Sequence, residues 1–155
     1  MSTRGYVGIR KNEVDKGGYN HYDSYPTGLG KCVLTFIQEK DMETLNNLYD
    51  EINDQVYNGD VWDWETCSFN KEFENYNDFL FDSLFCEYAY IINLDEGVLE
   101  FYIGFNKNPE ADGRYAHKIG ERGYCGVRLA KTMKLEDIIN NKYRADEEEN
   151  FVENE

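Results

Sequence analysis

Two apolar runs that alternate with a period of two residues constrain the fold of this chain more than any other feature. They occupy residues 87–94 and 98–105, and the segment Asp95-Glu96-Gly97 separates them. Runs with this alternation indicate strands, and a short acidic segment that ends in glycine is typical of a tight turn. The sequence therefore predicts a β-hairpin over 87–105, and the fold must contain a sheet that holds it.

Apolar residues at helical spacing mark two further segments. Asp41 is a suitable helix N-cap, and the apolar positions after it recur at helical intervals as far as Val56. The same spacing, from Ser68 or Asn70 to Leu84, predicts another helix. The remaining expected elements are strands at 5–10, 19–25 and 124–132, a turn over 11–18, and helices at 30–38 and 135–139.

This order of elements predicts the fold class. Strands that follow one another through short turns usually pair antiparallel. We therefore expect an α+β fold, with a mainly antiparallel sheet of about five strands and two or three helices packed on one face. The length of 155 residues is that of one domain. We expect a single α+β domain over 1–144 and an acidic, mobile C-terminal tail over 145–155.

The composition also predicts a location. No apolar run reaches the ~18 residues that a membrane helix needs, and no apolar stretch follows the first charge as it would in a signal peptide. Both observations favour a cytoplasmic protein that does not bind membranes. Without a secretory signal, the four cysteines are expected to be free and mostly buried thiols: Cys32, Cys67, Cys86 and Cys125.

Charge is distributed unevenly along the chain. The formal net charge is −15, from 16 Lys and Arg against 31 Asp and Glu. Residues 41–100 hold a single basic side chain, Lys71, among sixteen acidic ones. Direct binding to nucleic acid is not expected, because phosphates require a basic surface. The acidic segment serves either solubility alone or the recognition of a basic protein surface.

Acidic and aromatic residues are interleaved within that segment, over 57–65. If the aromatic rings are exposed, they would anchor a partner while the carboxylates complement its charge. The alternative is that both tryptophans belong to the core. The candidate partner-binding residues are Asp50, Glu51, Asp54, Asp60, Trp62, Asp63 and Trp64.

A second candidate site lies near the N-terminus. If 19–25 is a strand, His21 and Asp23 share a face, so Asp23 could orient His21 as a general acid or base. Arg4 could clamp an anionic group. The alternative is that His21 and Asp23 only form a satisfied polar pair that closes the hairpin. The candidate ligand-binding residues are Thr3, Arg4, Tyr19, Asn20, His21 and Asp23.

The N-terminus itself offers a third possibility for chemistry. If Met1 is removed, Ser2 could act as an N-terminal nucleophile with its own amine as the base. The candidate catalytic residues are therefore His21, Asp23 and Ser2.

The N-terminal region carries the pattern Thr-Arg-Gly at 3–5, Gly-Ile at 8–9 and Tyr-Asn-His-Tyr-Asp-Ser-Tyr-Pro-Thr-Gly-Leu-Gly at 19–30. This pattern resembles an uncharacterised family of small bacterial and phage-type proteins, and 87–105 is similar to the second hairpin of that family. The resemblance implies one compact domain and a shared site near residues 3–25. It implies no function.

Together these observations predict an acidic intracellular binding or regulatory protein, such as a phage-encoded inhibitor that engages a basic protein surface. The alternative is a small-ligand-binding protein or hydrolase with its site on the N-terminal hairpin. The expected partner is a protein with a basic surface or, under the alternative, a small anionic ligand. No cofactor and no metal are expected.

Overall fold

The computed structural model describes residues 3–143 and residue 151. The main sheet has five strands in the order β2-β1-β5-β6-β7: β1 (Gly5–Lys11), β2 (Val14–Asn20), β5 (Tyr88–Asn93), β6 (Val98–Ile103) and β7 (Arg128–Lys134). A small second sheet joins β3 (Trp62–Asp63) to β4 (Ser68–Phe69). The α-helices are α1 (Lys31–Gln38), α2 (Met42–Glu51) and α3 (Leu135–Ile139). Short helical turns are η1 (Pro26–Gly30), η2 (Asn77–Phe81) and η3 (Glu121–Gly123).

The α+β class is confirmed, but the main sheet is mixed rather than mainly antiparallel. Strand β1 pairs in parallel with β5, with Gly5 opposite Tyr88. The other three neighbouring pairs, β1–β2, β5–β6 and β6–β7, are antiparallel. The prediction was wrong because it considered only strands joined by turns. The two hairpins meet through a long crossover that contains α1 and α2, and a crossover of this length permits parallel pairing.

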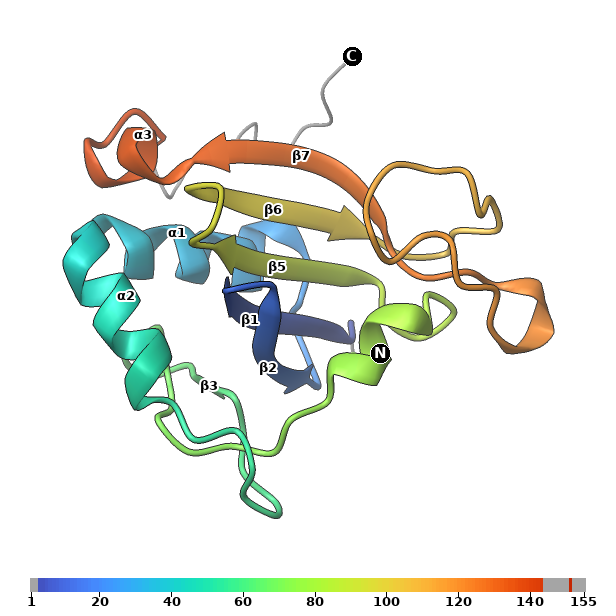
Figure 1. The fold of residues 1–155 in the computed structure, drawn as a ribbon, viewed down its shortest axis with the longest axis horizontal. Helices are drawn as coiled ribbons and strands as arrows, with labels where there is room; N and C mark the ends of the chain where they lie inside the picture. Colours follow the sequence, from blue (N-terminus) through green and yellow to red (C-terminus); the bar gives the residue numbers. More distant parts are fainter. Residues whose placement is uncertain (1–2, 144–150, 152–155) are drawn as a thin grey trace.

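The two faces of the sheet carry different hydrophobic cores. All three α-helices pack on one face, where Val33, Leu45 and Ile138 bury their side chains against Ile9 and Phe101. The other face is covered by η2 and by the long loop between β6 and β7, through residues that include Leu80 and Val127. Figure 1 shows α2 and α3 toward the left of the sheet and this loop toward the right.

The first hairpin turns earlier than the sequence predicted. The expected turn over 11–18 is wrong: a two-residue turn at Asn12 and Glu13, both at positive φ, connects β1 to β2. Gly17 therefore lies inside a strand, where it leaves room for the Tyr6 ring, since a Cβ there would approach the Tyr6 hydroxyl to 2.2 Å. The expected strand over 19–25 is also wrong, because β2 ends at Asn20.

Asp95 braces this turn from the neighbouring hairpin. Its Oδ1 accepts the Asn12 N–H (2.7 Å) and its Oδ2 accepts the Glu13 N–H (2.8 Å). These two hydrogen bonds lower the pKa of Asp95 below the ordinary carboxyl value. Both turn residues therefore depend on a carboxylate that remains ionised at mildly acidic pH.

We expect Asp95→Asn to lower the free energy of unfolding at neutral pH, by less than about 1 kcal/mol because solvent screens the exposed carboxylate. A carboxyl whose folded pKa is lowered stabilises the fold above its unfolded pKa, and this contribution disappears as the pH falls through the folded pKa. The difference between wild type and D95N should therefore vanish in acid. Urea unfolding of both proteins from neutral to acidic pH measures it, and a pH-independent difference would contradict the role of the ionised carboxylate.

The helix predicted between 68 and 84 is absent. Residues 68–69 form β4, residues 72 and 74 bridge to Asn53 and Gln55, and only η2 is helical. Phe73 lies in the core on the helical side, whereas Leu80 lies in the core on the other side. One straight helix could not reach both faces of the sheet, so the chain crosses the β2 edge in an extended form.

The other elements follow the sequence more closely. The hairpin over 87–105 and the helices at 30–38 and 135–139 are confirmed as β5–β6, α1 and α3. Asp41 caps α2 as predicted, accepting the Thr44 N–H at 2.7 Å. Helix α2 ends at Glu51, before the predicted Val56, and the last strand is shifted to 128–134.

The expectation of four free thiols is wrong. Cys32 of α1 and Cys67 form a disulfide across 35 residues, while Cys86 and Cys125 are free and buried. Spacing gave no signal for the pair, because the two sulfurs meet only when the segment before β4 folds back onto α1.

Two further predictions concerned the C-terminal tail and the absence of a membrane-spanning helix. The acidic tail over 145–155 lies outside the described residues except for Phe151, which is buried against Tyr90 and Phe101. Within the described part of the chain, none of the helices has the length and apolar character needed to cross a membrane.

Candidate functional site

Three of the six predicted ligand-binding residues gather in one hollow. Thr3, Arg4 and His21 line an open depression of about 400 Å³ together with Leu84, Phe85, Glu87 and Phe105. The Arg4 guanidinium lies 5.5 Å from the centre of the Phe85 ring. The Arg4 backbone N–H donates to Glu87 Oε2 at 2.9 Å. The hollow thus combines a cation, an imidazole and aromatic walls.

Tyr19 lies between this hollow and a second one. Its hydroxyl is 2.7 Å from His21 Nδ1, and its ring lines a groove on the other side. Burial raises the pKa of Tyr19, partly offset by the charge of Arg4 and its hydrogen bond. Tyr19 therefore stays protonated at neutral pH and can hold the His21 ring in place.

His21 and Asp23 do not form the predicted pair. Because β2 ends at Asn20, the two residues do not share a strand face, and Asp23 instead adopts φ +55°. Asp23 Oδ1 accepts the Tyr25 hydroxyl at 3.2 Å, which raises the pKa of Tyr25. Asp23 is therefore not the carboxylate that orients His21. Ser2, the other catalytic candidate, lies outside the described residues.

Asn20, also predicted to bind a ligand, makes hydrogen bonds within the fold. Its side-chain amide donates to Ser24 Oγ (2.8 Å) and to the Tyr22 carbonyl (2.7 Å), and its Oδ1 accepts the Trp64 indole N–H (3.1 Å). The Tyr90 hydroxyl donates to the Ser24 carbonyl at 2.8 Å. A satisfied polar cluster does close the hairpin, but it is built from Asn20 and Ser24 rather than from His21 and Asp23.

The tryptophans of the acidic segment are not exposed anchors. Trp62 is 4% exposed, and its indole N–H points to Cys32 Sγ at 3.4 Å. Trp64 is half-buried and stacks on Tyr22, with 5.6 Å between ring centres. Asp54 is also buried, and its carboxylate accepts hydrogen bonds from Gln55 and Asn75. These three residues therefore contribute to the fold, and their predicted role in partner binding stays a prediction.

The other acidic candidates lie at the surface. Asp50 and Glu51 are exposed on α2 and pair with Lys11 (3.2 Å) and Lys71 (3.1 Å), respectively. Asp63 accepts the Glu65 N–H in the turn after β3. Asp60 is exposed and lines a groove.

That groove has a volume of about 470 Å³ and lies between residues 58–60 and 74–76. Asp60 and Glu74 supply carboxylates, and Tyr19 and Tyr76 supply rings, with Tyr76 48% exposed. Backbone hydrogen bonds fix its walls: the Glu74 N–H donates to the Gly59 carbonyl and the Tyr76 N–H to the Gly17 carbonyl, each at 3.0 Å. We call this site the acidic groove.

Sequence reasoning missed Glu74 and Tyr76 because it placed them on a helix. The burial of 72–76 has the period of a strand instead, with exposed residues at 72, 74 and 76 and a fully buried Phe73 between them. The sequence carried no such signal, because the exposed Tyr76 follows the buried Phe73 at a helical spacing of three residues.

A buried ionic cluster on the loop-covered face was also missed. The Arg114 guanidinium makes two hydrogen bonds to the Glu100 carboxylate, at 2.8 and 2.7 Å, and Glu100 is 4% exposed. Tyr115 donates to Asp15, which also accepts from Arg10 at 3.1 Å. Burial and the Asp15 charge raise the pKa of Tyr115. This cluster connects the long loop to the sheet. Among the described residues, every buried side-chain polar atom has a hydrogen-bond partner.

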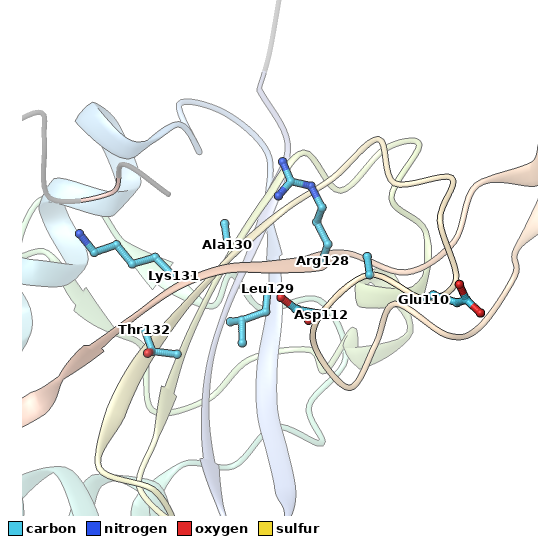
Figure 2. A pocket seen from close by; sticks show the side chains of 8 residues that line it. Glu110, Asp112, Arg128, Leu129, Ala130, Lys131 and Thr132 are labelled. Carbon is cyan, nitrogen blue, oxygen red and sulfur yellow. The ribbon is translucent and has the colours of Figure 1, made fainter. Parts of the chain in front are cut away.

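A further hollow of about 390 Å³ lies where residues 110–112 meet β7. Figure 2 shows Arg128 and Leu129 on opposite sides of this edge strand. The Leu129 N–H donates to the Asp112 carbonyl at 2.8 Å, so the loop already occupies part of the strand edge.

Comparison with known proteins yields no relative: no protein-family model, curated protein or solved structure matches the chain. The resemblance suggested by the N-terminal pattern therefore stays an expectation.

Proposed function

We propose that this chain is a binding protein whose acidic groove receives a basic side chain of a protein partner. The observation that carries the proposal is the combination, in one preformed groove, of two carboxylates with two tyrosine rings. Carboxylates recognise an ammonium or a guanidinium by charge-assisted hydrogen bonds. Tyrosine rings attract the same cations through their π faces. An arginine satisfies both kinds of contact, because its planar head can stack and donate at once.

The surroundings of the groove strengthen this preference. Asn58 and Asn75 line it as well and offer carbonyl oxygens to a donor. The formal net charge of −15 provides a long-range field that would attract a basic partner before contact. The sequence predicted that the acidic segment recognises a basic protein surface, and we assign this recognition to Asp60 and Glu74.

The cytoplasmic location and the phage origin expected from the sequence are not needed for this proposal. The Cys32–Cys67 disulfide is of a kind that persists mainly in oxidising compartments. A partner with an arginine-rich surface can be met in any compartment.

The test is the affinity for an arginine-rich peptide, measured by fluorescence anisotropy at low and at physiological salt. We expect the double variant D60K/E74K to bind at least about tenfold more weakly, since two favourable charge contacts become repulsive. Tyr76→Ala should weaken binding by about two- to fivefold through the lost cation–π contact.

The matched control is E43K/E136K, which makes the same change of net charge at two exposed positions on α2 and α3. It should keep most of the affinity. If both double variants lose affinity equally, overall charge rather than the groove binds the peptide, and the proposal fails.

A further inference from the structure

A large aromatic side chain is held exposed next to Arg4. Phe105 is 55% exposed and has φ +54°, a backbone conformation that bulky residues rarely adopt. Its N–H donates to the Ser83 carbonyl at 2.6 Å, and the next N–H, of Asn106, donates to Ser83 Oγ at 3.0 Å. Ser83 and Asn106 are both buried. The surrounding structure thus holds the ring outward, although this conformation costs free energy.

A second exposed ring faces the same hollow. Phe85 is 41% exposed and, with Phe105 and Leu84, forms the apolar part of its lining. Exposed phenylalanines are uncommon on a surface as polar as this one, and two of them in one concave site favour a planar aromatic ligand.

The polar part of the lining contains one permanent cation, Arg4, and one carboxylate, Glu87. Among the described residues, no carboxylate forms an ion pair with the Arg4 guanidinium, which instead lies over the Phe85 ring. The single carboxylate in the lining, that of Glu87, already accepts the Arg4 backbone N–H. Thr3 and His21 add a hydroxyl and an imidazole. Such donors would stabilise a negatively charged group.

Two more basic side chains lie beyond the hollow. Lys118 and Arg122 line an adjoining depression that shares Leu84 and Phe85 with this one, although Asp78 and Asp82 line it too. The two depressions together are lined by three basic and three acidic side chains, so this site is less acidic than the chain as a whole, whose net charge is −15.

From these observations we infer that the hollow is a binding site for a small aromatic anion, a planar ring that carries a phosphate or a carboxylate. The ring packs against Phe105 and Phe85, and the anionic group lies against Arg4 and His21. This site is separate from the acidic groove and goes beyond the protein–protein function proposed for it. The sequence already led us to expect a small anionic ligand, and Phe85 and Phe105 indicate in addition that this ligand carries an aromatic ring.

The experiment is a titration of the full chain, followed by isothermal calorimetry and by the amide resonances of Arg4 and Phe105. Adenosine 5′-monophosphate and indole-3-acetate are the two charged aromatic probes, and they distinguish a nucleotide from an aromatic carboxylate. Adenosine and inorganic phosphate are the matched probes that lack the charge or the ring. We expect at least one charged aromatic probe to bind at least tenfold more tightly than either matched probe.

Two variants locate the binding. Phe105→Asn removes the ring and suits a positive φ, so the protein should be at least as thermostable as wild type, while probe affinity falls at least fivefold. Arg4→Gln should reduce affinity at least tenfold. Ile119→Asn, at a residue that is 65% exposed outside this lining, and Lys31→Gln are the matched controls and should bind as wild type.

Several outcomes overturn the inference. One is the absence of binding by every probe up to about 10 mM. Another is binding that survives both Phe105→Asn and Arg4→Gln. Equal binding of adenosine and its monophosphate would show an apolar surface without anion recognition. Self-association by sedimentation that Phe105→Asn abolishes would assign the two rings to a contact with a second copy of the chain.

Discussion

Replacing Arg114 by methionine is expected to lower the free energy of unfolding by about 3–5 kcal/mol, the usual loss when one partner of a buried ion pair is removed. The variant leaves the Glu100 carboxylate buried, with Tyr102 and Asn93 as its remaining hydrogen-bond donors. The loss should be visible in urea unfolding. Amide exchange should quicken in the 106–123 loop, which Arg114 ties to the sheet.

A double variant separates charge from packing. In E100Q/R114M the buried charge is gone, and a glutamine oxygen can still accept the Tyr102 hydroxyl. We expect this protein to recover at least about 2 kcal/mol relative to R114M, because much of the single-variant loss is the cost of a buried unpaired carboxylate. Equal stability of the single and double variants would show that the pair acts through packing alone.

Opening the Cys32–Cys67 disulfide is the other change with a large expected effect. In the chain-entropy description, closing a loop of 35 residues stabilises a fold by about 4 kcal/mol. C32A/C67S should therefore unfold at a markedly lower urea concentration than wild type. A reductant should shift the wild-type midpoint toward that of the variant.

Two controls make this result decisive. The reductant should leave C32A/C67S unchanged, because Cys86 and Cys125 are not cross-linked. Thiol titration of denatured, non-reduced wild type should find two reactive thiols rather than four. Four thiols, or a wild-type midpoint that ignores complete reduction, would contradict a structural role for the cross-link.

Sequence reasoning succeeded where the structural signal was local. The 87–105 hairpin was predictable because its turn and both strands lie within one short segment, and the Asp41 cap because it is satisfied three residues away. Sequence reasoning failed where contacts between residues far apart in the chain determine the structure. The β1–β5 pairing, the strand-like path of 72–76 and the disulfide all depend on residues far along the chain.

The candidate sites divide in the same way. Thr3, Arg4 and His21 do meet in a hollow, although the strand expected to pair His21 with Asp23 ends at Asn20. Phe105 gave no signal, because its importance comes from a positive φ imposed by the buried Ser83. The interleaved tryptophans suggested an interface, but Trp62 is buried and Trp64 is half-buried. Each indole N–H has a polar partner inside the fold, Cys32 Sγ for Trp62 and Asn20 Oδ1 for Trp64, so neither ring needs to face solvent.

The parallel pairing of β1 with β5 also affects how the chain folds during its synthesis. On the ribosome, the first hairpin emerges more than eighty residues before the strand that will cover its inner edge, since Gly5 pairs with Tyr88. During that interval β1 presents unpaired backbone groups and apolar side chains, the features that promote aggregation of nascent chains. The outer edge of β5, by contrast, pairs with β6, which follows it after a turn of four residues. The N-terminal hairpin therefore remains unpaired on one side until β5 has been synthesised. We expect the yield of folded protein in the cell to depend on how well this edge is protected from aggregation during that time.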